Sequence, residues 1–399
     1  MKISSIKAIP WSPDQTPDSY GVLASRNFVA VKVETDEGIT GWGDATVGPL
    51  SVANMVEELG DIILGEDPAR IDYHWERLYH LNHVQGGPIQ LSAISGIEMA
   101  LWDIKGKSLG VPVYELLGGK FRDRIWTYGR WDGITPEAAV EHALSQKSKG
   151  LTALKGDPFD HKGLFISYEA EKKAVDTLAA VREAVGNDME LLVECHGRLA
   201  PSSAIRIANE MEQYRPFVYE EPVPWENLDA LQRVAEAVNI PIATGERLYT
   251  KWDYAQLLNR NIVAMIQPDI IQGGGISEMK KIAAMAAAHY VGYQSHAIHG
   301  PMDVCSALHI AASIPNFMIN EGGNYFRWRE IAEDMVMGEF PNLTDGYVSI
   351  PTSPGLGVAM NEEWLEKHPP VETRSQPGNA VWAQQAGRLP SRQFEQWNP

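Results

Sequence analysis

Hydrophobic residues in the first part of the chain fall into short segments, rich in Val and Ile and bounded by turn residues, that favour β-strands. The predicted strands are Lys2–Pro10, Asn27–Glu34 and Ile39–Trp42. Thr35-Asp36-Glu37-Gly38 is the turn between the second and the third. From about Val52 to Leu117 apolar residues recur three and four positions apart, which predicts helices, and Gly118-Gly119 ends that stretch. Strands followed by helices predict a separate α+β domain of roughly 120 residues.

Beyond Trp126 the pattern becomes an alternation of short apolar segments with longer amphipathic ones. The predicted strands are Trp126–Gly129, Thr152–Lys155, Glu190–Glu194, Phe217–Glu220, Ile242–Glu246, Ala264–Asp269, Val291–His296 and Phe317–Glu321. The clearest helices between them are Ser202–Tyr214, Leu228–Ala237 and Ser277–His289. Eight strands with helical crossovers over about 200 residues favour a β/α barrel over an open sheet. The rest of the chain, from about Asp345, is rich in Pro and Gly, and we expect it to wrap back as strands and loops.

Each of the last six predicted strands ends in an ionisable residue. These residues are Glu194, Glu220, Glu246, Asp269, His296 and Glu321, separated by 26, 26, 23, 27 and 25 positions. In a barrel they all lie at the C-terminal mouth, where such enzymes keep their active sites. An isolated carboxylate at a strand end is more often a helix N-cap or a salt-bridge partner, and an isolated histidine is more often a packing residue. Six consecutive predicted strands that each end in an ionisable residue favour an active site instead.

Three of these carboxylates, on Glu194, Glu220 and Glu246, come from consecutive strands and would repel one another. Their pKa values would rise unless a cation lay among them. Ligation by oxygen alone suits a hard ion such as Mg²⁺, with water and substrate oxygens completing its shell. The sequence therefore predicts a Mg²⁺ site that binds a substrate carboxylate and stabilises the charge formed when the adjacent carbon loses a proton.

Proton transfer also needs a base, and His296 and Asp269 end neighbouring predicted strands, where they can form a hydrogen bond. A carboxylate behind an imidazole fixes its tautomer and raises its basicity. His196 follows Glu194 by two residues, which places it on the same side of the pleat as a second acid or base. Glu321, if protonated, could donate a hydrogen bond to the substrate carboxylate, and the alternative for it is a salt bridge.

Composition and charge narrow the class of protein. The chain has 399 residues, 44% of them hydrophobic and 22% charged, which is typical of a globular protein with two packed units. Its formal net charge of −18 argues against nucleic acid and anionic membranes as partners. An acidic protein that binds an acidic substrate needs a local cation, which a metal would supply.

The two cysteines, Cys195 and Cys305, are too few for a disulfide framework or a thiolate metal site. No apolar run approaches the ~18 residues that cross a bilayer, and the first residues lead into no signal-peptide core. We therefore expect the protein to stay in the cytoplasm.

Several motifs give the chain a family resemblance. They are Glu194-Cys195-His196-Gly197-Arg198, Tyr219-Glu220-Glu221-Pro222, Thr244-Gly245-Glu246-Arg247, Pro268-Asp269 with Gly273-Gly274-Gly275-Ile276, and Gln294-Ser295-His296. The match extends outward through Ala100-Leu101-Trp102-Asp103-Ile104-Lys105-Gly106-Lys107, Leu116-Leu117-Gly118-Gly119 and Pro354-Gly355-Leu356-Gly357-Val358. Their order and spacing resemble the enolase superfamily and, within it, the mandelate racemase-type acid-sugar dehydratases, over essentially the whole chain.

The resemblance implies a fold and an assembly. An N-terminal α+β capping domain would span residues 1–124, and a (β/α)7β TIM-like barrel would span residues 125–345. A C-terminal segment, residues 346–399, would pack back on the capping domain. Because the family's capping domain closes over the barrel mouth, loops near Tyr20 and Gly43-Asp44 would shape the pocket. A homo-oligomer, either an octamer or a smaller even-numbered assembly, is also implied.

The resemblance also implies roles for single residues. Glu194, Glu220 and Glu246 would bind Mg²⁺, His296 with Asp269 would be the base dyad, and Glu321 would steady the enediolate. The Glu-Cys-His-Gly-Arg stretch is similar to the Asp-x-His-Gly-Arg of galactonate-type dehydratases, whose histidine protonates the departing hydroxyl; here that histidine is His196. The implied reaction is the dehydration of an aldonate, such as galactonate or gluconate, to a 2-keto-3-deoxy sugar acid.

Two features differ from the family pattern. The first metal ligand in most of this group is Asp, whereas here it is Glu194, which is one methylene longer. Racemases and cycloisomerases of the superfamily commonly carry Lys-x-Lys at the second barrel strand, whereas this chain has Lys155-Gly156-Asp157-Pro158. Without the second lysine a base on that face is lacking, which argues against racemisation and favours dehydration.

Other assignments stay open at the level of the sequence. Lys155 would either bind substrate or form a structural salt bridge, and Arg198 would either bind substrate or support a metal-site glutamate. His299 could contact the polyol end or the carboxylate of the substrate. A sugar-acid cycloisomerase or epimerase would use the same metal and His296. The alternative outside catalysis is a metal-binding barrel retained as a regulatory or structural protein.

Overall fold

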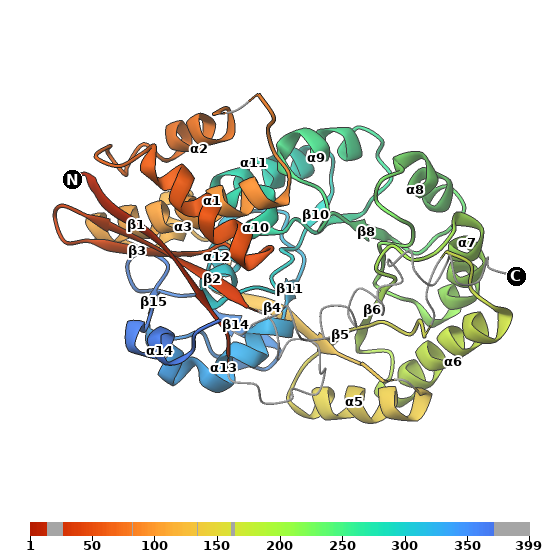
Figure 1. Cartoon of the computed structure of the whole chain (residues 1–399). Helices are drawn as coiled ribbons and strands as arrows, with labels where there is room; N and C mark the ends of the chain where they lie inside the picture. Colours follow the sequence, from red (N-terminus) through yellow and green to blue (C-terminus); the bar gives the residue numbers. More distant parts are fainter. Residues whose placement is uncertain (14–26, 82, 134, 161–163, 371–399) are drawn as a thin grey trace, which may run out of the picture.

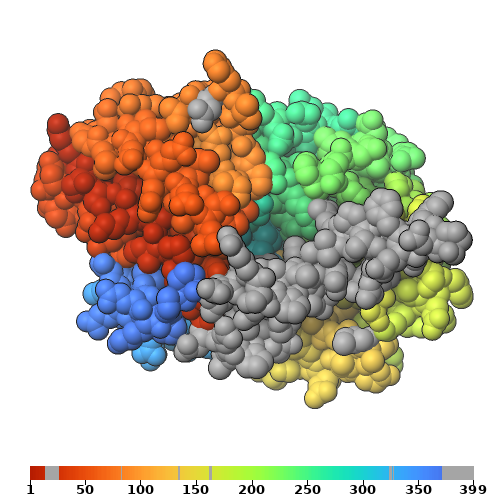
Figure 2. Space-filling model, viewed as in Figure 1, coloured from red at the N-terminus to blue at the C-terminus, as the bar shows by residue number. Residues whose placement is uncertain are grey.

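The computed structural model describes residues 1–13, 27–81, 83–133, 135–160 and 164–370. An N-terminal sheet with its helices lies beside a ring of strands that is surrounded by helices (Figure 1). The surfaces of these two parts, orange and green, meet along a line that runs down the upper half of the space-filling view (Figure 2). Tyr20 lies outside the described residues. Within the described ranges, no helix combines the length and the apolar character that crossing a membrane requires.

The N-terminal part is a three-stranded antiparallel sheet with helices, as the sequence predicts. The strands, in spatial order, are β1 (Ile3–Trp11), β2 (Phe28–Thr35) and β3 (Thr40–Asp44). The helices are α1 (Pro49–Asp61), α2 (Ile71–Tyr79), α3 (Pro88–Leu109) and α4 (Val113–Leu116). Helix α3 is apolar around most of its circumference because it is buried between this sheet and the barrel.

The second part is a closed parallel barrel. Its strands, in ring order, are β4 (Arg124–Arg130), β5 (Ala153–Gly156), β6 (Glu190–Glu194), β7 (Val218–Glu220), β8 (Ile242–Thr244), β9 (Met265–Ile266), β10 (Gly292–Tyr293) and β11 (Asn320–Glu321). β11 pairs with β4, and the ring closes where Tyr293 N donates to Asn316 O at 2.8 Å and Met318 N donates to Tyr293 O at 2.9 Å. The barrel predicted from the alternation of strands and helices is confirmed.

Helical crossovers connect the eight strands, as a (β/α)7β barrel requires. They are α5 (Pro136–Ser148), α6 (Tyr168–Val185), α7 (Pro201–Met211) with the 3₁₀ turn η1 (Glu212–Tyr214), α8 (Leu228–Ala235), α9 (Thr250–Leu258), α10 (Ile270–Gly273) with α11 (Gly275–Ala288), and α12 (Pro301–Ser313). The barrel interior is filled by side chains of alternating strand positions, including Tyr128, Leu192, Ala243 and Met265, so it is a packed core.

After β11 the chain returns to the N-terminal part. The elements are α13 (Gly323–Met335), β12 (Val336–Gly338), β13 (Leu343–Thr344), β14 (Tyr347–Ser349), β15 (Val358–Met360) and α14 (Glu362–Lys367). Leu356 N donates to Asp103 Oδ1 of α3 at 2.8 Å, and the ring centroids of Trp364 and Trp11 lie 5.4 Å apart. The domain boundaries at residues 124 and 345 remain predictions.

A buried carboxylate of helix α3 contacts the barrel. Glu98 accepts hydrogen bonds from Ile276 N and Ser277 N, both at 2.8 Å, at the start of α11. Burial raises the pKa of Glu98 to about 7, although these hydrogen bonds oppose the rise. Gly275 has φ +86°, and a Cβ there would lie 2.3 Å from Glu98 Oε2. A glycine is therefore needed at this contact between the two parts.

Three barrel strands end earlier than the sequence predicts, at Thr244, Ile266 and Tyr293. Glu246, Asp269 and His296 accordingly lie in the loops just beyond them. Pro268, which follows β9, has no N–H to continue a strand ladder. A parallel bridge between Asp269 and His296 nevertheless keeps these two loops aligned, and both still open onto the mouth of the barrel.

Candidate active site

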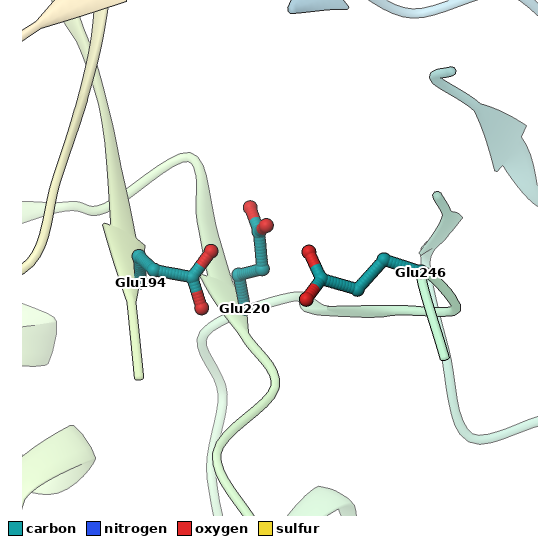
Figure 3. Close-up of side chains that lie close together, drawn as sticks. All are labelled: Glu194, Glu220 and Glu246. Atoms are coloured by element: carbon teal, nitrogen blue, oxygen red, sulfur yellow. The ribbon is translucent and has the colours of Figure 1, made fainter. Parts of the chain in front are cut away.

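Three glutamates from consecutive strands converge at the mouth of the barrel. Glu194 and Glu220 are the last residues of β6 and β7, and Glu246 follows β8 by two residues. One carboxylate oxygen of each lies within 4.8 Å of the others. Figure 3 shows the three carboxylates directed toward a common space. The structure thus brings together the residues predicted as metal ligands, and we refer to them as the glutamate triad.

Lys155 extends from β5 into the same cluster. Its Nζ lies 2.7 Å from Glu220 Oε1, 3.3 Å from Glu194 Oε2 and 3.4 Å from Glu321 Oε1. Burial opposes the ammonium form, but the surrounding carboxylates, led by Glu220 and Glu321, raise the pKa of Lys155 well above its usual value. These carboxylates therefore favour the charged form of Lys155. Of its two possible roles, the structure has the salt bridge, and a substrate contact remains a prediction.

Lys155 balances only part of the negative charge of the triad, so a further cation can bind among the glutamates. Burial and the neighbouring Glu194 raise the pKa of Glu220 well above its ordinary value, even beside Lys155. Glu220 Oε2 is buried, and no donor among the described residues reaches it. A buried oxygen without a partner, in a set of carboxylate donors only, fits a hard divalent ion such as Mg²⁺.

A second cluster is built on Asp269, which holds two histidines. His296 Nδ1 lies 2.7 Å from Asp269 Oδ2, and His299 Nε2 lies 2.9 Å from the same oxygen. Asp269 Oδ1 accepts from Gln272 N at 2.7 Å, as the N-cap of α10. Because a carboxylate only accepts, His296 carries a proton on Nδ1, and in its neutral form it keeps the lone pair on Nε2. This Nε2 lies 3.3 Å from Glu246 Oε2, so it faces the glutamate triad.

The surroundings of His296 are strongly anionic. Burial opposes the charging of His296, but Glu246, Asp269 and Glu321 together raise its pKa to about 10. Burial likewise disfavours the ionised form of Asp269, yet His299 and His296 hold the pKa of Asp269 well below its usual value. A cation bound by Glu246 would offset part of the negative charge that acts on His296.

His196 lies in a strained turn beyond β6. Its φ is +50°, in the left-handed region that few residues other than glycine adopt. Its N–H donates to Glu194 Oε1 at 2.6 Å, and its ring Nδ1 lies 2.7 Å from Asp157 Oδ2. The strand pleat ends at Glu194, so it does not carry His196 toward the mouth as the sequence reasoning assumed. The left-handed turn, and not the pleat, brings His196 beside Glu194.

Arg198 binds Asp157 and not a glutamate of the triad. Its guanidinium bonds both carboxylate oxygens of Asp157, and its Nε donates to Cys195 O at 3.0 Å. The two roles considered for Arg198 from the sequence were to bind substrate or to support a metal-site glutamate, and neither included Asp157. A contact between Arg198 and the substrate remains a prediction. Asp157 is the candidate that sequence reasoning missed. The available signal was a carboxylate two positions after Lys155, where the family's second lysine is absent.

Glu321, the last residue of β11, lies between the two clusters. Its Oε2 accepts from Ala297 N at 3.2 Å, and its Oε1 pairs with Lys155. Burial disfavours ionisation, but Lys155 and His296 hold the pKa of Glu321 below its usual value. The structure therefore favours the carboxylate form, whereas the predicted hydrogen bond to substrate needs the acid form.

The predicted loop at Gly43-Asp44 reaches the barrel close to His299. Asp44 Oδ2 accepts from Asp303 N at 2.8 Å, and Asp303 Oδ2 accepts from His299 N at 3.1 Å. Burial raises the pKa of Asp44 to about 7. His299 is turned toward Asp269, so the contact predicted between His299 and the substrate remains a prediction.

The chain matches known protein families along both of its parts. Residues 8–118 match "Mandelate racemase / muconate lactonizing enzyme, N-terminal domain", and residues 138–364 match "Enolase C-terminal domain-like". The chain belongs to the mandelate racemase and muconate lactonizing enzyme family. Membership of this family, within the enolase superfamily, confirms the relationship predicted from the motifs at the strand ends.

Relatives in the mandelate racemase and muconate lactonizing enzyme family cover nearly the whole chain. The D-galactonate dehydratase of Xanthomonas euvesicatoria pv. vesicatoria (strain 85-10) is 37% identical over 374 residues, which is 92% of this chain and 97% of that protein. The D-galactonate dehydratase of Pectobacterium atrosepticum is 39% identical over 341 residues, 84% of this chain and 89% of that protein. A mandelate racemase/muconate lactonizing enzyme from Jannaschia sp. CCS1 superposes with a TM-score of 0.86 at 34% identity, covering 94% of this chain and 99% of that one.

Proposed function

We propose that this protein is a hydro-lyase that dehydrates an aldonate to a 2-keto-3-deoxy sugar acid. The observation that carries the proposal is the pair of histidines, His196 and His296, each bonded to an aspartate and each beside a different glutamate of the triad. The D-galactonate dehydratases at 37% and 39% identity support an aldonate as the class of substrate. Galactonate and gluconate are the first candidates.

His296 is the base in this proposal. Its Nε2 takes the proton from C2 of the substrate, while Asp269 holds the other proton on Nδ1 and stabilises the imidazolium that forms. The electron pair of the C2–H bond is first held in an enediolate of the substrate, and it then forms the C2–C3 double bond as the C3–O bond breaks. His196 gives a proton to the departing hydroxyl, which leaves as water. The enol that remains tautomerises to the 2-keto acid.

Glu194, Glu220 and Glu246 would hold a divalent ion, which we propose to be Mg²⁺ because the donor set is oxygen only. When bound, such an ion supplies positive charge to the substrate carboxylate and offsets the negative charge that develops as C2 loses its proton. Lys155 holds Glu194 and Glu220 together through its ion pairs. We also propose that Glu321 stabilises the enediolate, a role that requires the protonated form of Glu321.

The proposal includes the finer expectations about partners and location. These are a sugar acid as the small-molecule substrate, a homo-oligomeric assembly, no nucleic acid or membrane partner, and a place in the cytoplasm. The acidic charge of −18 supports the expected absence of nucleic acid and membrane partners, because it would repel anionic polymers and lipid surfaces.

The test is a screen of hexonates and pentonates with Mg²⁺, read out by semicarbazide detection of 2-keto acids. We expect at least one aldonate to give a 2-keto acid with the wild-type protein and none with His296→Asn. Melting curves of the two proteins with and without Mg²⁺ show whether the variant is folded and still binds metal. A wild type that binds Mg²⁺ and forms no 2-keto acid from any member contradicts dehydration.

Epimerisation at C2 is the second candidate, because the structure has an aspartate-supported imidazole on each of two different strand pairs. Both histidines would then act on one carbon, and no water would leave. Exchange of the C2 proton in D₂O without formation of a 2-keto acid is the signature that separates this reaction from dehydration.

A further inference from the structure

The active site contains a second carboxylate–imidazole pair with the geometry of the base dyad. His196 Nδ1 lies 2.7 Å from Asp157 Oδ2, and His296 Nδ1 lies 2.7 Å from Asp269 Oδ2. The first pair joins the ends of β5 and β6, and the second joins the loops after β9 and β10. In the ring order of the eight strands these two positions are four places apart, and therefore on opposite sides of the ring.

The glutamate triad lies between the two pairs. The N–H of His196 donates to Glu194 at 2.6 Å, and His296 Nε2 lies 3.3 Å from Glu246. A substrate whose carboxylate is held at the triad would lie between the strand ends that carry the two imidazoles. One of them can remove a proton while the other delivers one.

Asp157 is held in place as an acceptor. The guanidinium of Arg198, only 6% exposed, bonds both oxygens of the Asp157 carboxylate. Burial disfavours ionisation, but Arg198 and His196 lower the pKa of Asp157 below its usual value. An ionised carboxylate only accepts, so His196 carries a proton on Nδ1, and any proton that it gives to a substrate leaves from Nε2. The side chain of His196 remains 30% exposed, and the Asp157 carboxylate occupies its Nδ1 position.

The backbone of His196 is fixed independently of its ring. The left-handed turn at φ +50° is held by the hydrogen bond from His196 N to Glu194 and by one from Gly197 N to Glu221 O at 2.7 Å. Only the His196 side chain can then still rotate, and its hydrogen bond to Asp157 prevents this rotation.

We propose that Asp157 is a positioning residue for the acid step: it accepts the Nδ1–H of the His196 imidazolium and fixes the direction of the ring, so that Nε2–H meets the hydroxyl on C3. This inference rests on the proposed dehydration. Asp157 itself touches neither the substrate nor the transferred proton, and Arg198 acts one step further back by holding Asp157.

The leaving group separates the acid step from the base step. With a hydroxyl on C3, the electron pair of the C2–H bond forms the C2–C3 double bond, the C3–O bond breaks, and the oxygen takes the Nε2 proton of His196 to leave as water. With a fluorine on C3, the C3–F bond breaks to give fluoride ion, which needs no proton in order to leave. Both substrates lose the same C2 proton to His296 and give the same 2-keto acid.

The experiment compares the aldonate that the wild type dehydrates with its 3-deoxy-3-fluoro analogue, in the full-length protein with Mg²⁺. For Asp157→Asn we expect kcat to fall about 100-fold with the hydroxyl substrate and less than about threefold with the fluoro substrate. His196→Asn should show the same pattern, and His296→Asn should lose both reactions. Asp160→Asn is the matched control in the same loop, since Asp160 is exposed and pairs with Lys173 at 2.9 Å.

The ratio of the two rates is measured on one preparation, so it does not depend on how much of a variant is folded. Equal loss on both substrates in Asp157→Asn, or no loss with the hydroxyl substrate, overturns the positioning role and leaves the proposed function standing. A wild type that makes no 2-keto acid from either substrate overturns the proposed function, and the inference falls with it.

Discussion

His296 and His299 donate hydrogen bonds to one and the same oxygen of Asp269, at 2.7 and 2.9 Å. Their rings lie at 86° to each other with centroids 6.4 Å apart, so neither blocks the other's approach to the carboxylate. Trp328 Nε1 donates to the carbonyl oxygen of His299 at 2.6 Å, and Asp303 accepts from its N–H. The Asp269 carboxylate is therefore oriented by a second histidine, His299. Asp303 of α12 and Trp328 of α13 hold His299 in place.

Replacing this second histidine tests that arrangement. In His299→Leu, Asp269 keeps its bonds to Gln272 and His296 but loses one donor, and we expect kcat to fall about 10-fold to 100-fold. His299→Gln retains an N–H that can reach Asp269 and should keep most of the activity. The measurement is kcat for 2-keto acid formation at saturating Mg²⁺. Equal activity in His299→Leu and the wild type would show that His299 does not support the base.

Removal of a predicted ligand tests the glutamate triad. Glu246→Gln keeps the shape of the side chain but removes a negative charge, so we expect weaker Mg²⁺ binding by titration calorimetry, by about 10-fold or more. Glu226→Gln, on the exposed side of the loop after β7, is the matched control and should bind as the wild type does. Chelation with EDTA should abolish 2-keto acid formation, and added Mg²⁺ should restore it. Unchanged affinity in Glu246→Gln would remove Glu246 from the ligand set.

Lys155 supplies positive charge to the same carboxylates that the ion would bind. Lys155→Met leaves Glu194 and Glu220 buried without it, so we expect the free energy of unfolding in EDTA to fall by about 3–5 kcal/mol. Mg²⁺ should then stabilise the variant more than the wild type, because the carboxylates have lost a competing cation.

The measurement for Lys155→Met is denaturant unfolding with and without Mg²⁺. Lys172→Met is the control, since its pair with Asp176 is exposed and such pairs contribute at most about 1 kcal/mol. An equal gain from Mg²⁺ in Lys155→Met and the wild type is the result that would refute this role.

The barrel and the converging side chains could be predicted because both depend on local patterns. Strand period, helix period and one polar residue per strand end are visible in the sequence, and parallel pairing brings Glu194 beside Glu220 without further information. The surroundings of His196 could not be predicted in this way. They depend on a left-handed residue, on the loop after β5 and on an arginine that reaches back to Asp157.

The same limit applies to Lys155. Its position in β5, two residues after Ala153, places its side chain inside the barrel, but only the three-dimensional arrangement shows that Glu194, Glu220 and Glu321 all surround its ammonium group. The partner of a long buried cation is set by which strand ends meet across the barrel. Sequence spacing does not give that distance.

The junction between α3 and the barrel makes a prediction about stability. At Gly275, alanine meets both an unfavourable φ of +86° and a contact of 2.3 Å with Glu98 Oε2, so we expect a loss of more than about 2 kcal/mol in Gly275→Ala. Gly38 has a similar φ of +80° with nothing within 4 Å of an added Cβ. Gly38→Ala should therefore cost only about 1 kcal/mol, the conformational part alone. Equal losses in the two variants, measured by denaturant unfolding, would mean that Glu98 moves aside freely.

His309 makes the stability of the protein depend on pH. It is fully buried in α12, where its Nδ1 accepts from Tyr114 N at 3.3 Å and its Nε2 donates to Leu356 O at 3.2 Å. The neutral ring satisfies both partners, whereas a second proton would face the Tyr114 N–H. Burial lowers the pKa of His309 from 6.5 to about 4. Its neutral form is therefore part of the contact between the barrel, α4 and the C-terminal segment.

The sign of the pH effect follows from this lowered pKa. Below pH 6.5 the unfolded chain binds a proton at His309 that the folded protein does not take up until about pH 4. The contribution of this group is fully present above pH 6.5 and is lost as the pH falls to about 4, for a total of about 3 kcal/mol. In His309→Gln, the amide can accept from Tyr114 and donate to Leu356 at every pH, so the fall in unfolding free energy between pH 7 and pH 4 should be smaller than in the wild type. His289→Gln, at the partly exposed C-terminal end of α11, is the control for losing a histidine. If His309→Gln lost as much stability on acidification as the wild type and this control, the acid sensitivity would have to arise from other groups.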